Sequence, residues 1–210
     1  MHEFIYRRKS IRKFKPDLIP KEDIEACLKA ASAAPSGKNL QNWHFVVVTN
    51  PEKIKKVADA VVEANRLYCS YTSDETKKEM FRNSLSYQTL FVGAPVLILV
   101  YASPYAVTAA GLLEDKPPTA AELQKLLRHN PGIQNIGATM QNLLLAAAEM
   151  GYGTCWMTGP VFAEESINAA IGFDKDDFYL ACITPLGVPE DTKHPQPPRK
   201  PLEETVTWIE

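Results

Sequence analysis

The sequence predicts a single domain of mixed helices and strands, and three observations support that prediction. Its 210 residues suit one domain of ordinary size. Apolar residues make up 45% of the chain and charged residues 23%, so a sizeable core is available and wholesale disorder is excluded. Segments with apolar residues at helical spacing alternate with short runs rich in β-branched residues, and this alternation is typical of a mixed fold.

Two helices and a strand are predicted at the start of the chain. The first helix begins after Pro20, where acidic residues occupy the first turn, and it ends before Pro35. Residues 43–48 form a short β-rich run, which predicts a strand. Pro51 then opens a second helix with apolar residues on one face.

Helices and strands continue to alternate further along. After a polar stretch, 67–87, in which a helix is expected from Asp74, the continuously apolar run 95–101 predicts a strand buried on both faces. The remaining elements are an irregular excursion over 105–118, a short helix over 119–128, a long apolar helix over 133–150 capped by Gly151, a strand over 154–157, a helix over 163–171 closed by Gly172, and a strand over 178–186.

The C-terminal segment is predicted to be an extended arm. Five prolines lie within residues 189–201, and they exclude packed secondary structure there. A short strand over 205–208, which contains Trp208, is expected to end the chain. Such an arm needs a surface to pack on, so we expect residues 189–210 to pack on a second subunit.

Charge and cysteine usage exclude several classes of protein. The 23 basic and 25 acidic residues leave a formal charge of −2, which argues against a general nucleic-acid binder. There is no C-x-x-C pair to suggest a redox dithiol or a zinc site. No secretory signal is visible, and the longest apolar stretch, 90–102, is too short to cross a bilayer. The expected compartment is therefore the cytoplasm. The histidines lack metal-ligand spacing and no Ser or Cys has a nearby base, so neither a metal site nor a hydrolase is predicted.

A basic run near the N-terminus, R-R-K-S-I-R-K over residues 7–13, is the first candidate site. Taken alone, such a run is most often a solvated basic turn. Arg8, Ser10 and Arg12 occupy alternate positions, however, and would project to one side of an extended segment. Two guanidinium forks and a hydroxyl on one side are suited to holding a phosphate.

Two further loops are candidates for ligand contact. The loop over residues 34–43 carries the carboxamides of Asn39 and Gln41, which can read the edge of a heteroaromatic ring but could equally cap their own turn. The glycine-rich stretch over 151–160 lacks the spacing of a nucleotide-binding loop. Gly159, before Pro160, would nevertheless allow a ligand to approach the backbone closely.

Taken together, these motifs resemble the nitroreductase family of flavin enzymes. The resemblance rests on R-R-K-S-I-R-K-F at residues 7–14, A-P-S-G-K-N-L-Q-N-W at 34–43, G-Y-G-T-C-W-M-T-G at 151–159, and P-L-G-V-P-E with P-P-R-K-P-L-E-E near the end. Family membership implies an α+β fold with a central, mostly antiparallel sheet flanked by helices. It also implies an intertwined homodimer with one FMN at each of two sites in the subunit interface.

The resemblance assigns cofactor-binding roles residue by residue. Arg8, Ser10 and Arg12 match the family's phosphate and ribityl contacts, and Lys9 occupies a position in the same run that often contacts the flavin. Arg199, with Lys200, matches a late cation that returns to the phosphate. Pro35, Ser36, Asn39 and Gln41 match the loop that the other subunit lays against the flavin, and Thr158 and Gly159 match the stretch beside the isoalloxazine ring. Asn42 departs from the family's usual Pro, which bears on the stiffness of that loop.

The implied function is an FMN-dependent oxidoreductase that passes hydride from NADH or NADPH to a small electron-poor acceptor, such as a nitroaromatic or a quinone, by a ping-pong mechanism. Because the cofactor carries the chemistry, no catalytic side chain is expected. Aromatic residues such as Phe81, Tyr87 or Tyr105 would line the mouth of the acceptor site. Two alternatives remain: a flavin-binding sensor or store without efficient NAD(P)H turnover, and an anion-binding module without flavin.

Overall fold

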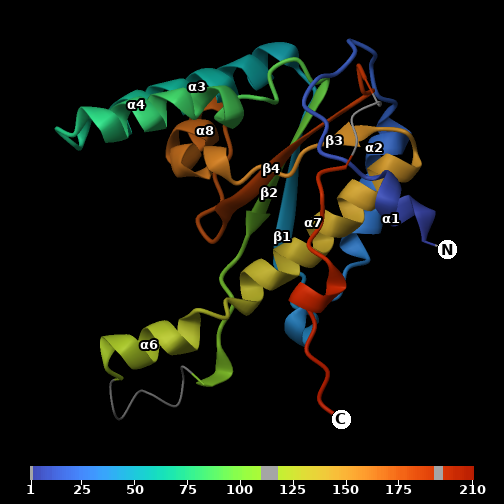
Figure 1. Cartoon of the computed structure of the whole chain (residues 1–210). Helices are drawn as coiled ribbons and strands as arrows, with labels where there is room; N and C mark the ends of the chain where they lie inside the picture. Colours follow the sequence, from blue (N-terminus) through green and yellow to red (C-terminus); the bar gives the residue numbers. More distant parts are fainter. Residues whose placement is uncertain (1, 110–117, 192–195) are drawn as a thin grey trace.

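A four-stranded antiparallel sheet organises the chain. The computed structural model describes residues 2–109, 118–191 and 196–210 (Figure 1). The strands are β1 (Trp43–Val48), β2 (Val96–Ala102), β3 (Gly153–Thr154) and β4 (Tyr179–Gly187), in the order β1-β2-β4-β3. Every pairing between them is antiparallel, so the predicted α+β class is confirmed.

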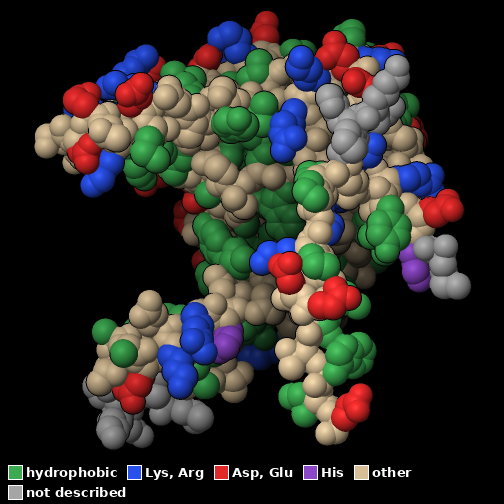
Figure 2. Space-filling model, viewed as in Figure 1, with side chains coloured by type: hydrophobic (Ala, Val, Ile, Leu, Met, Phe, Trp, Pro, Cys, Tyr) green, Lys and Arg blue, Asp and Glu red, His purple; other side chains and the backbone are tan. Residues whose placement is uncertain are grey.

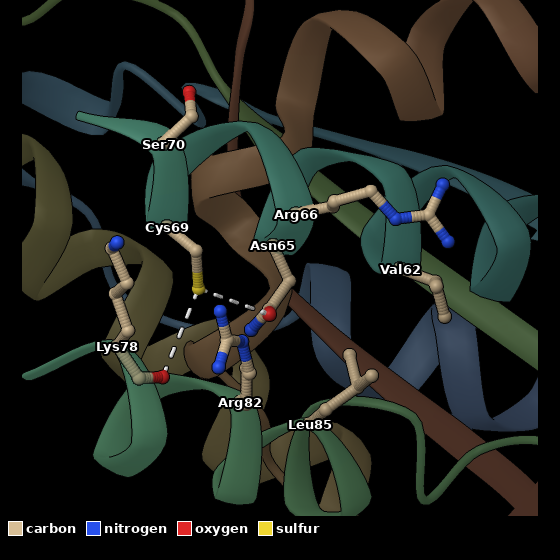
Figure 3. A pocket seen from close by; sticks show the side chains of 8 residues that line it. All are labelled: Val62, Asn65, Arg66, Cys69, Ser70, Lys78, Arg82 and Leu85. Carbon is tan, nitrogen blue, oxygen red and sulfur yellow. Dashed lines mark hydrogen bonds between the residues drawn. The ribbon is translucent and has the colours of Figure 1, made fainter. Parts of the chain in front are cut away.

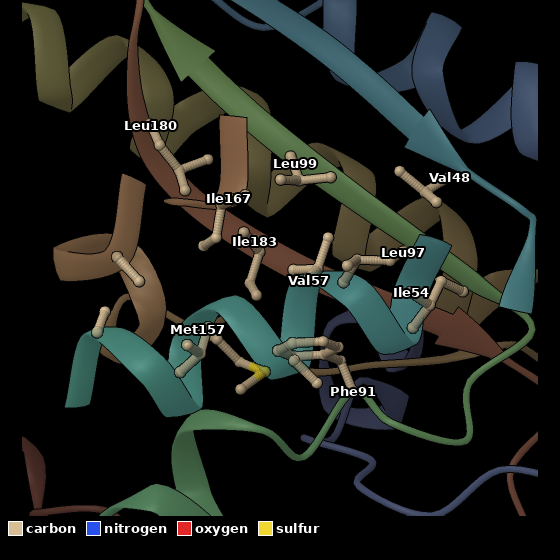
Figure 4. Close-up of a cluster of buried hydrophobic side chains, with 14 of the residues drawn as sticks. Val48, Ile54, Val57, Phe91, Leu97, Leu99, Met157, Ile167, Leu180 and Ile183 are labelled. Carbon is tan, nitrogen blue, oxygen red and sulfur yellow. The ribbon is translucent and has the colours of Figure 1, made fainter. Parts of the chain in front are cut away.

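Helices cover both faces of this sheet. On one side α3 (Pro51–Ser70) packs against α8 (Glu164–Ile171), and on the other α2 (Lys21–Ser32) packs against α7 (Pro131–Glu149) (Figure 1). Strand β2 is buried along its whole length. Its alternate residues divide between two cores: Leu97, Leu99 and Tyr101 join the α3 side, shown in Figure 4, while Val96, Ile98 and Val100 join the α7 side. The predicted strand with two buried faces is therefore confirmed.

Local sequence signals set most helix ends where they were predicted. Helix α2 begins directly after Pro20, and Asn50 caps α3 by accepting from the amides of Glu52 and Lys53. Thr119 forms a capping box with Glu122 at the start of α6 (Ala120–Leu127). After α7, Gly151 takes φ 85° and the amide of Tyr152 reaches Ala147 O, which makes a Schellman motif. Gly172 closes α8 in the left-handed region.

Of three further short helices, the one expected from Asp74 is confirmed and the other two were not predicted. Helix α4 (Glu75–Asn83) starts one residue after Asp74, whose side chain caps it, and α5 (Leu85–Gln88) follows at once. The five-residue helix α1 (Glu3–Arg7) was not predicted, because it is too short for a periodic pattern and buries no residue. The 3₁₀ turns whose bounds lie within the described residues include η1 (Gly37–Asn39), η3 (Gly159–Ala163) and η4 (Leu202–Glu204).

Two strand predictions need correction. The strand expected over 154–157 is β3, which ends at Thr154, and Met157 rejoins the sheet only through an isolated bridge to Ile183. The strand expected over 205–208 is wrong: those residues follow η4 without strand pairing, and Trp208 is 80% exposed. β-prone residues alone do not form a strand when no neighbouring edge supplies hydrogen bonds.

Parts of two predictions lie outside the described residues. These are 110–117 of the irregular excursion and 192–195 of the arm. The start of the arm pairs with its own chain, since Phe14 bridges Pro189 and the amide of Glu190 donates to Lys13 O. All four cysteines are buried free thiols. Within the described part of the chain, no helix combines the length and apolar character that a membrane span requires.

Candidate functional site

The basic run is held in an extended shape against β3. Ser10 forms a parallel bridge with Thr154, and the amide of Ile11 donates to Thr154 O at 2.8 Å. Gly153 makes this close approach possible, because a Cβ on Gly153 would lie 2.7 Å from the Cβ of Ile11. An extended segment turns alternate side chains to opposite sides, as the prediction from spacing required.

Arg8, Ser10 and Arg12 each affect the ionisation of the buried thiol of Cys155. Burial raises the pKa of Cys155 above its usual value. The charge of Arg12, a side-chain hydrogen bond from Ser10 and the charge of Arg8 act in the opposite direction. All three residues therefore act on the same buried thiol, and their role in holding a phosphate stays a prediction.

The C-terminal arm returns to this basic run and completes a hollow. The Gln196 side chain donates to the carbonyl oxygens of Tyr6 and Arg8, each at 2.6 Å, and so ties the arm to the N-terminal segment of its own chain. A hollow of about 350 Å³ lies there, lined by Arg8, Lys9, Ser10, Ile11, Arg12, Lys13, Asp191, Gln196, Pro197 and Arg199. Five cations and one carboxylate line it, which suits an anion.

A neighbouring hollow extends this region toward α7. It measures about 380 Å³ and shares Arg8, Ser10 and Arg199 with the first. Gln141 and Leu144 of α7 and the half-exposed Trp156 line its other wall. The structure thus brings residues from both ends of the sequence to one place: Arg8, Lys9, Ser10, Arg12 and Arg199. Lys200, in contrast, is exposed and lines neither hollow.

The loop over residues 36–41 is held in a strained backbone conformation. Lys38, Asn39 and Gln41 have φ values of 58°, 50° and 48°, in the left-handed region that non-glycine residues rarely occupy. Each such residue costs on the order of 1 kcal/mol, and strain of this kind concentrates at functional sites. The Gln41 amide donates to Ser36 Oγ at 3.0 Å, and the exposed side chain of Gln41 donates to that of Asn39 at 3.2 Å.

This loop lies away from the basic hollow of its own chain. The amide of Gly37 donates to Asn135 Oδ1 near the start of α7, whereas Leu144, further along α7, lines the hollow beside Arg8. Gln141 and Leu144, which both line that hollow, follow Asn135 by six and nine residues, a rise of about 9 Å and about 13.5 Å along the helix. Within one chain, Pro35, Ser36, Asn39 and Gln41 therefore do not line the hollows that Arg8 and Ser10 line.

Thr158 and Gly159 form an exposed corner between β3 and α8. They lie at the start of η3, and a Cβ on Gly159 would meet the Gln88 side chain at 3.6 Å. Phe162, three residues further on, packs edge-on against Tyr68 and Phe81. Of the aromatic residues proposed for the acceptor mouth, Phe81 thus lies in a cluster near this corner and Tyr87 is 70% exposed. Tyr105 instead packs on Gly37.

Another hollow, of about 360 Å³, opens between α3 and α4 (Figure 3). Its walls include the cations Arg66, Lys78 and Arg82, together with Asn65, Cys69 and Leu85. Arg66 pairs with Glu63 at 2.9 Å and Lys78 with Glu75 at 2.5 Å, so two of the three positive charges are already balanced. None of the predicted site residues lines this hollow.

Some residues that support the candidate site were not predicted from the sequence. Cys155 interacts with Ser10 and Gln196 with Arg8, while Asn135 holds Gly37 within the predicted loop, and all three interactions join distant parts of the chain. Asn42 is among them: the sequence marked it only as a departure from Pro, yet its buried amide donates to Ser103 O and Gly132 O. For Asn42 and Asn135 the available signal was a polar side chain among apolar neighbours, whereas Gln196 gave no local signal.

Comparison with known proteins finds a family match over most of the chain. The model of the Nitroreductase family matches residues 5–188. A BluB-like flavoprotein from Clostridium difficile 630 is 37% identical, has a TM-score of 0.91, and aligns over 99% of this chain and 98% of its own.

Two further relatives have lower sequence identity. An iodotyrosine deiodinase of Thermotoga neapolitana is 28% identical over 98% of this chain and 95% of its own length. An FMN-bound nitroreductase from Desulfitobacterium hafniense DCB-2 shares the fold, with a TM-score of 0.70 at 24% identity, over 99% of this chain and 97% of its own. On the match to the family model over nearly the whole chain, this protein belongs to the nitroreductase family.

Proposed function

We propose that the chain is an FMN-dependent oxidoreductase that takes hydride from NADH or NADPH and passes it to a small electron-poor acceptor, such as a nitroaromatic or a quinone. One observation carries the proposal: Arg8, Ser10 and Arg12 from one end of the chain and Arg199 from the other line a single cationic hollow. Sequence relatives that include a flavoprotein support the choice of flavin over another phosphate-bearing ligand.

The donor set fits the phosphate of FMN. Three guanidinium groups and a hydroxyl offer more hydrogen-bond donors than the phosphate oxygens need, and Arg forks match phosphate geometry. Toward the ring, the exposed corner at Thr158 and Gly159 leaves backbone accessible to a flat ligand. Asn39 and Gln41 would reach the ring from a second copy of the chain, since in their own chain they lie away from the hollow.

The residues of this chain bind and orient, while the flavin, when bound, supplies the hydride chemistry. Cations at the phosphate anchor the cofactor at the end remote from the reaction. Hydride donor and acceptor would use one open face of the ring in turn, which predicts ping-pong kinetics.

Anaerobic mixing of the FMN-loaded protein with NADH and with NADPH tests the proposal. Loss of the visible flavin absorption on a catalytic timescale, followed by its return on addition of a quinone, is the expected result. A flavin band that persists with both nucleotides would favour a sensor or store. A protein that stays colourless after incubation with FMN would favour an anion-binding module without flavin.

Reductive dehalogenation of a halogenated phenol is a second candidate, favoured by the deiodinase relative that aligns over 98% of this chain. The aromatic cluster of Tyr68, Phe81 and Phe162 near Gly159 offers a surface on which a phenol ring could stack. With dithionite as the electron source under argon, iodide release from 3-iodo-L-tyrosine would support this candidate. Quinone reduction without iodide release would exclude it.

Arg12→Ala should weaken FMN binding more than Lys13→Ala. Arg12 lies in phase with Arg8 and Ser10 and acts on Cys155, whereas Lys13, which also lines the hollow, is out of phase. Loss of a charged hydrogen bond to phosphate costs roughly 1.5 to 3 kcal/mol, about ten- to a hundredfold in affinity. Fluorescence titration of the apoprotein with FMN measures both variants. Equal losses would show that alternate positions do not determine which cation holds the phosphate.

A further inference from the structure

A buried pair of amide side chains lies beneath the loop over residues 36–41. Asn42 and Asn135 are 2% and 6% exposed, and the Asn135 amide donates to Asn42 Oδ1 at 2.8 Å. Asn42 in turn donates to Ser103 O at 3.1 Å and to Gly132 O at 3.3 Å. On the loop side, Asn135 Oδ1 accepts from the Gly37 amide at 3.0 Å. The pair thus joins the loop to the end of β2 and the start of α7.

These hydrogen bonds admit one orientation of each amide. Rotating the Asn135 side chain by half a turn would set its NH₂ group against the Gly37 N–H and its oxygen against Asn42 Oδ1. Rotating Asn42 would likewise turn its oxygen toward two carbonyl groups. Because the pair is buried, water cannot relieve such mismatches, so the network specifies a single arrangement.

The pair acts on both ends of the strained loop. Asn135 holds Gly37 at its start, and Asn42 follows Gln41 directly at its end. Between these anchors, Lys38, Asn39 and Gln41 keep their left-handed conformations, while the side chains of Asn39 and Gln41 stay exposed and bonded to each other. A fixed loop presents these carboxamides in one geometry before any ligand arrives, which lowers the ordering cost of binding.

We propose that Asn42 and Asn135 are positioning residues that preform the loop over residues 36–41 for contact with the flavin. This inference rests on the proposed FMN-binding function. In chains that carry Pro after the Gln of this loop, the ring itself would restrict the backbone. Here buried hydrogen bonds fix the same point of the chain to α7, the helix whose Gln141 and Leu144 line the cationic region.

A matched control lies on the same helix. Asn142 is a half-buried residue of α7 whose side chain donates to Ala30 O on α2 at 3.1 Å, and it contacts neither the loop nor the amide pair. Asn142→Ala therefore removes a side-chain hydrogen bond of similar kind from α7 without touching the loop. A purely structural role for Asn135 predicts that Asn135→Ala and Asn142→Ala behave alike.

The experiment compares wild type, Asn42→Ala, Asn135→Ala, the double variant and Asn142→Ala in full-length protein. Hydrogen exchange of the peptide covering residues 36–41 is measured without cofactor, and FMN affinity by fluorescence titration. We expect both pair variants to exchange faster at the loop and to bind FMN about tenfold more weakly. Since the pair acts as one unit, the double variant should lose less than the product of the two single losses. Asn142→Ala should match wild type in both measurements despite a lowered melting temperature.

Two results would overturn the inference. In the first, Asn135→Ala changes loop exchange and FMN affinity no more than Asn142→Ala does. In the second, the loop of Asn135→Ala exchanges faster but its FMN affinity equals that of wild type. If Asn135→Ala does not fold, Asn42→Ala, which leaves the Gly37 contact to Asn135 in place, is judged by the same criteria. Failure of wild type itself to bind FMN would instead sink the proposed function.

Discussion

At an FMN concentration too low to load either variant alone, a one-to-one mixture of Arg12→Ala and Gln41→Ala subunits should regain activity that neither variant shows by itself. If Gln41 serves the flavin held by the partner's Arg12, a mixed dimer has one doubly damaged site and one intact site. The mixed dimer then retains half of wild-type activity, and random exchange makes about half of all dimers mixed, so the mixture recovers about a quarter. Turnover of a quinone with NADH or NADPH, measured before and after subunit exchange, gives the result.

The structure makes this the expected outcome because one chain keeps the two groups apart. The loop meets α7 at Asn135, whereas the hollow beside Arg8 is lined further along this helix by Gln141 and Leu144, and no loop residue lines either cationic hollow. The matched control mixes Arg12→Ala with Arg8→Ala, two residues of one hollow, and every mixed dimer in it then has both sites damaged. No recovery with Gln41→Ala, despite exchange demonstrated by mass-tagged subunits, would mean that both residues serve the flavin of one chain.

Local patterns in the sequence were sufficient for most of the fold. Strand β1 falls on the predicted residues 43–48, and the uninterrupted apolar run gave β2, because a strand covered by helices on both faces has no polar side. Gly151 and Gly172 ended their helices as expected, since both adopt positive φ angles that other residues avoid. These features depend on neighbours within a few residues, which a sequence displays directly.

Predictions failed where the outcome depends on distant partners. Residues 205–208 pair with no strand in the described part of the chain, and β3 stops at Thr154 although apolar residues continue. The candidate site likewise combines residues that a local pattern indicated with residues that depend on distant partners. Arg8, Ser10 and Arg12 could be chosen by alternation, but Gln196, which brings the arm back to Arg8, gave no local signal. Asn42 was noticed only as an exception, and its buried partner Asn135 lies 93 residues away.

The C-terminal tail offers the sharpest test of whether dimerisation and cofactor retention are one event. Beyond Lys200 the tail lies exposed, with Leu202, Trp208 and Ile209 at 63%, 80% and 94% exposure (Figure 2). So much apolar surface on one segment is typical of a contact with another chain. A chain ending at Lys200 loses these side chains but keeps Gln196 and Arg199, and so keeps every residue that lines its own cationic hollow.

We therefore expect the chain that ends at Lys200 to dissociate at concentrations where the full chain is dimeric, and to lose FMN although its own phosphate contacts are intact. A monomer would present the Arg8 side of the site without the Asn39 and Gln41 side. Saturating FMN should raise the melting temperature of the full chain by several degrees through binding linkage, and that of the shortened chain by much less. Sedimentation velocity and the ratio of flavin to protein absorbance measure the two effects independently. If the shortened chain is monomeric yet retains full FMN occupancy, dimerisation and cofactor binding are separate events. If the shortened chain stays dimeric, the exposed tail has no role in holding the subunits together.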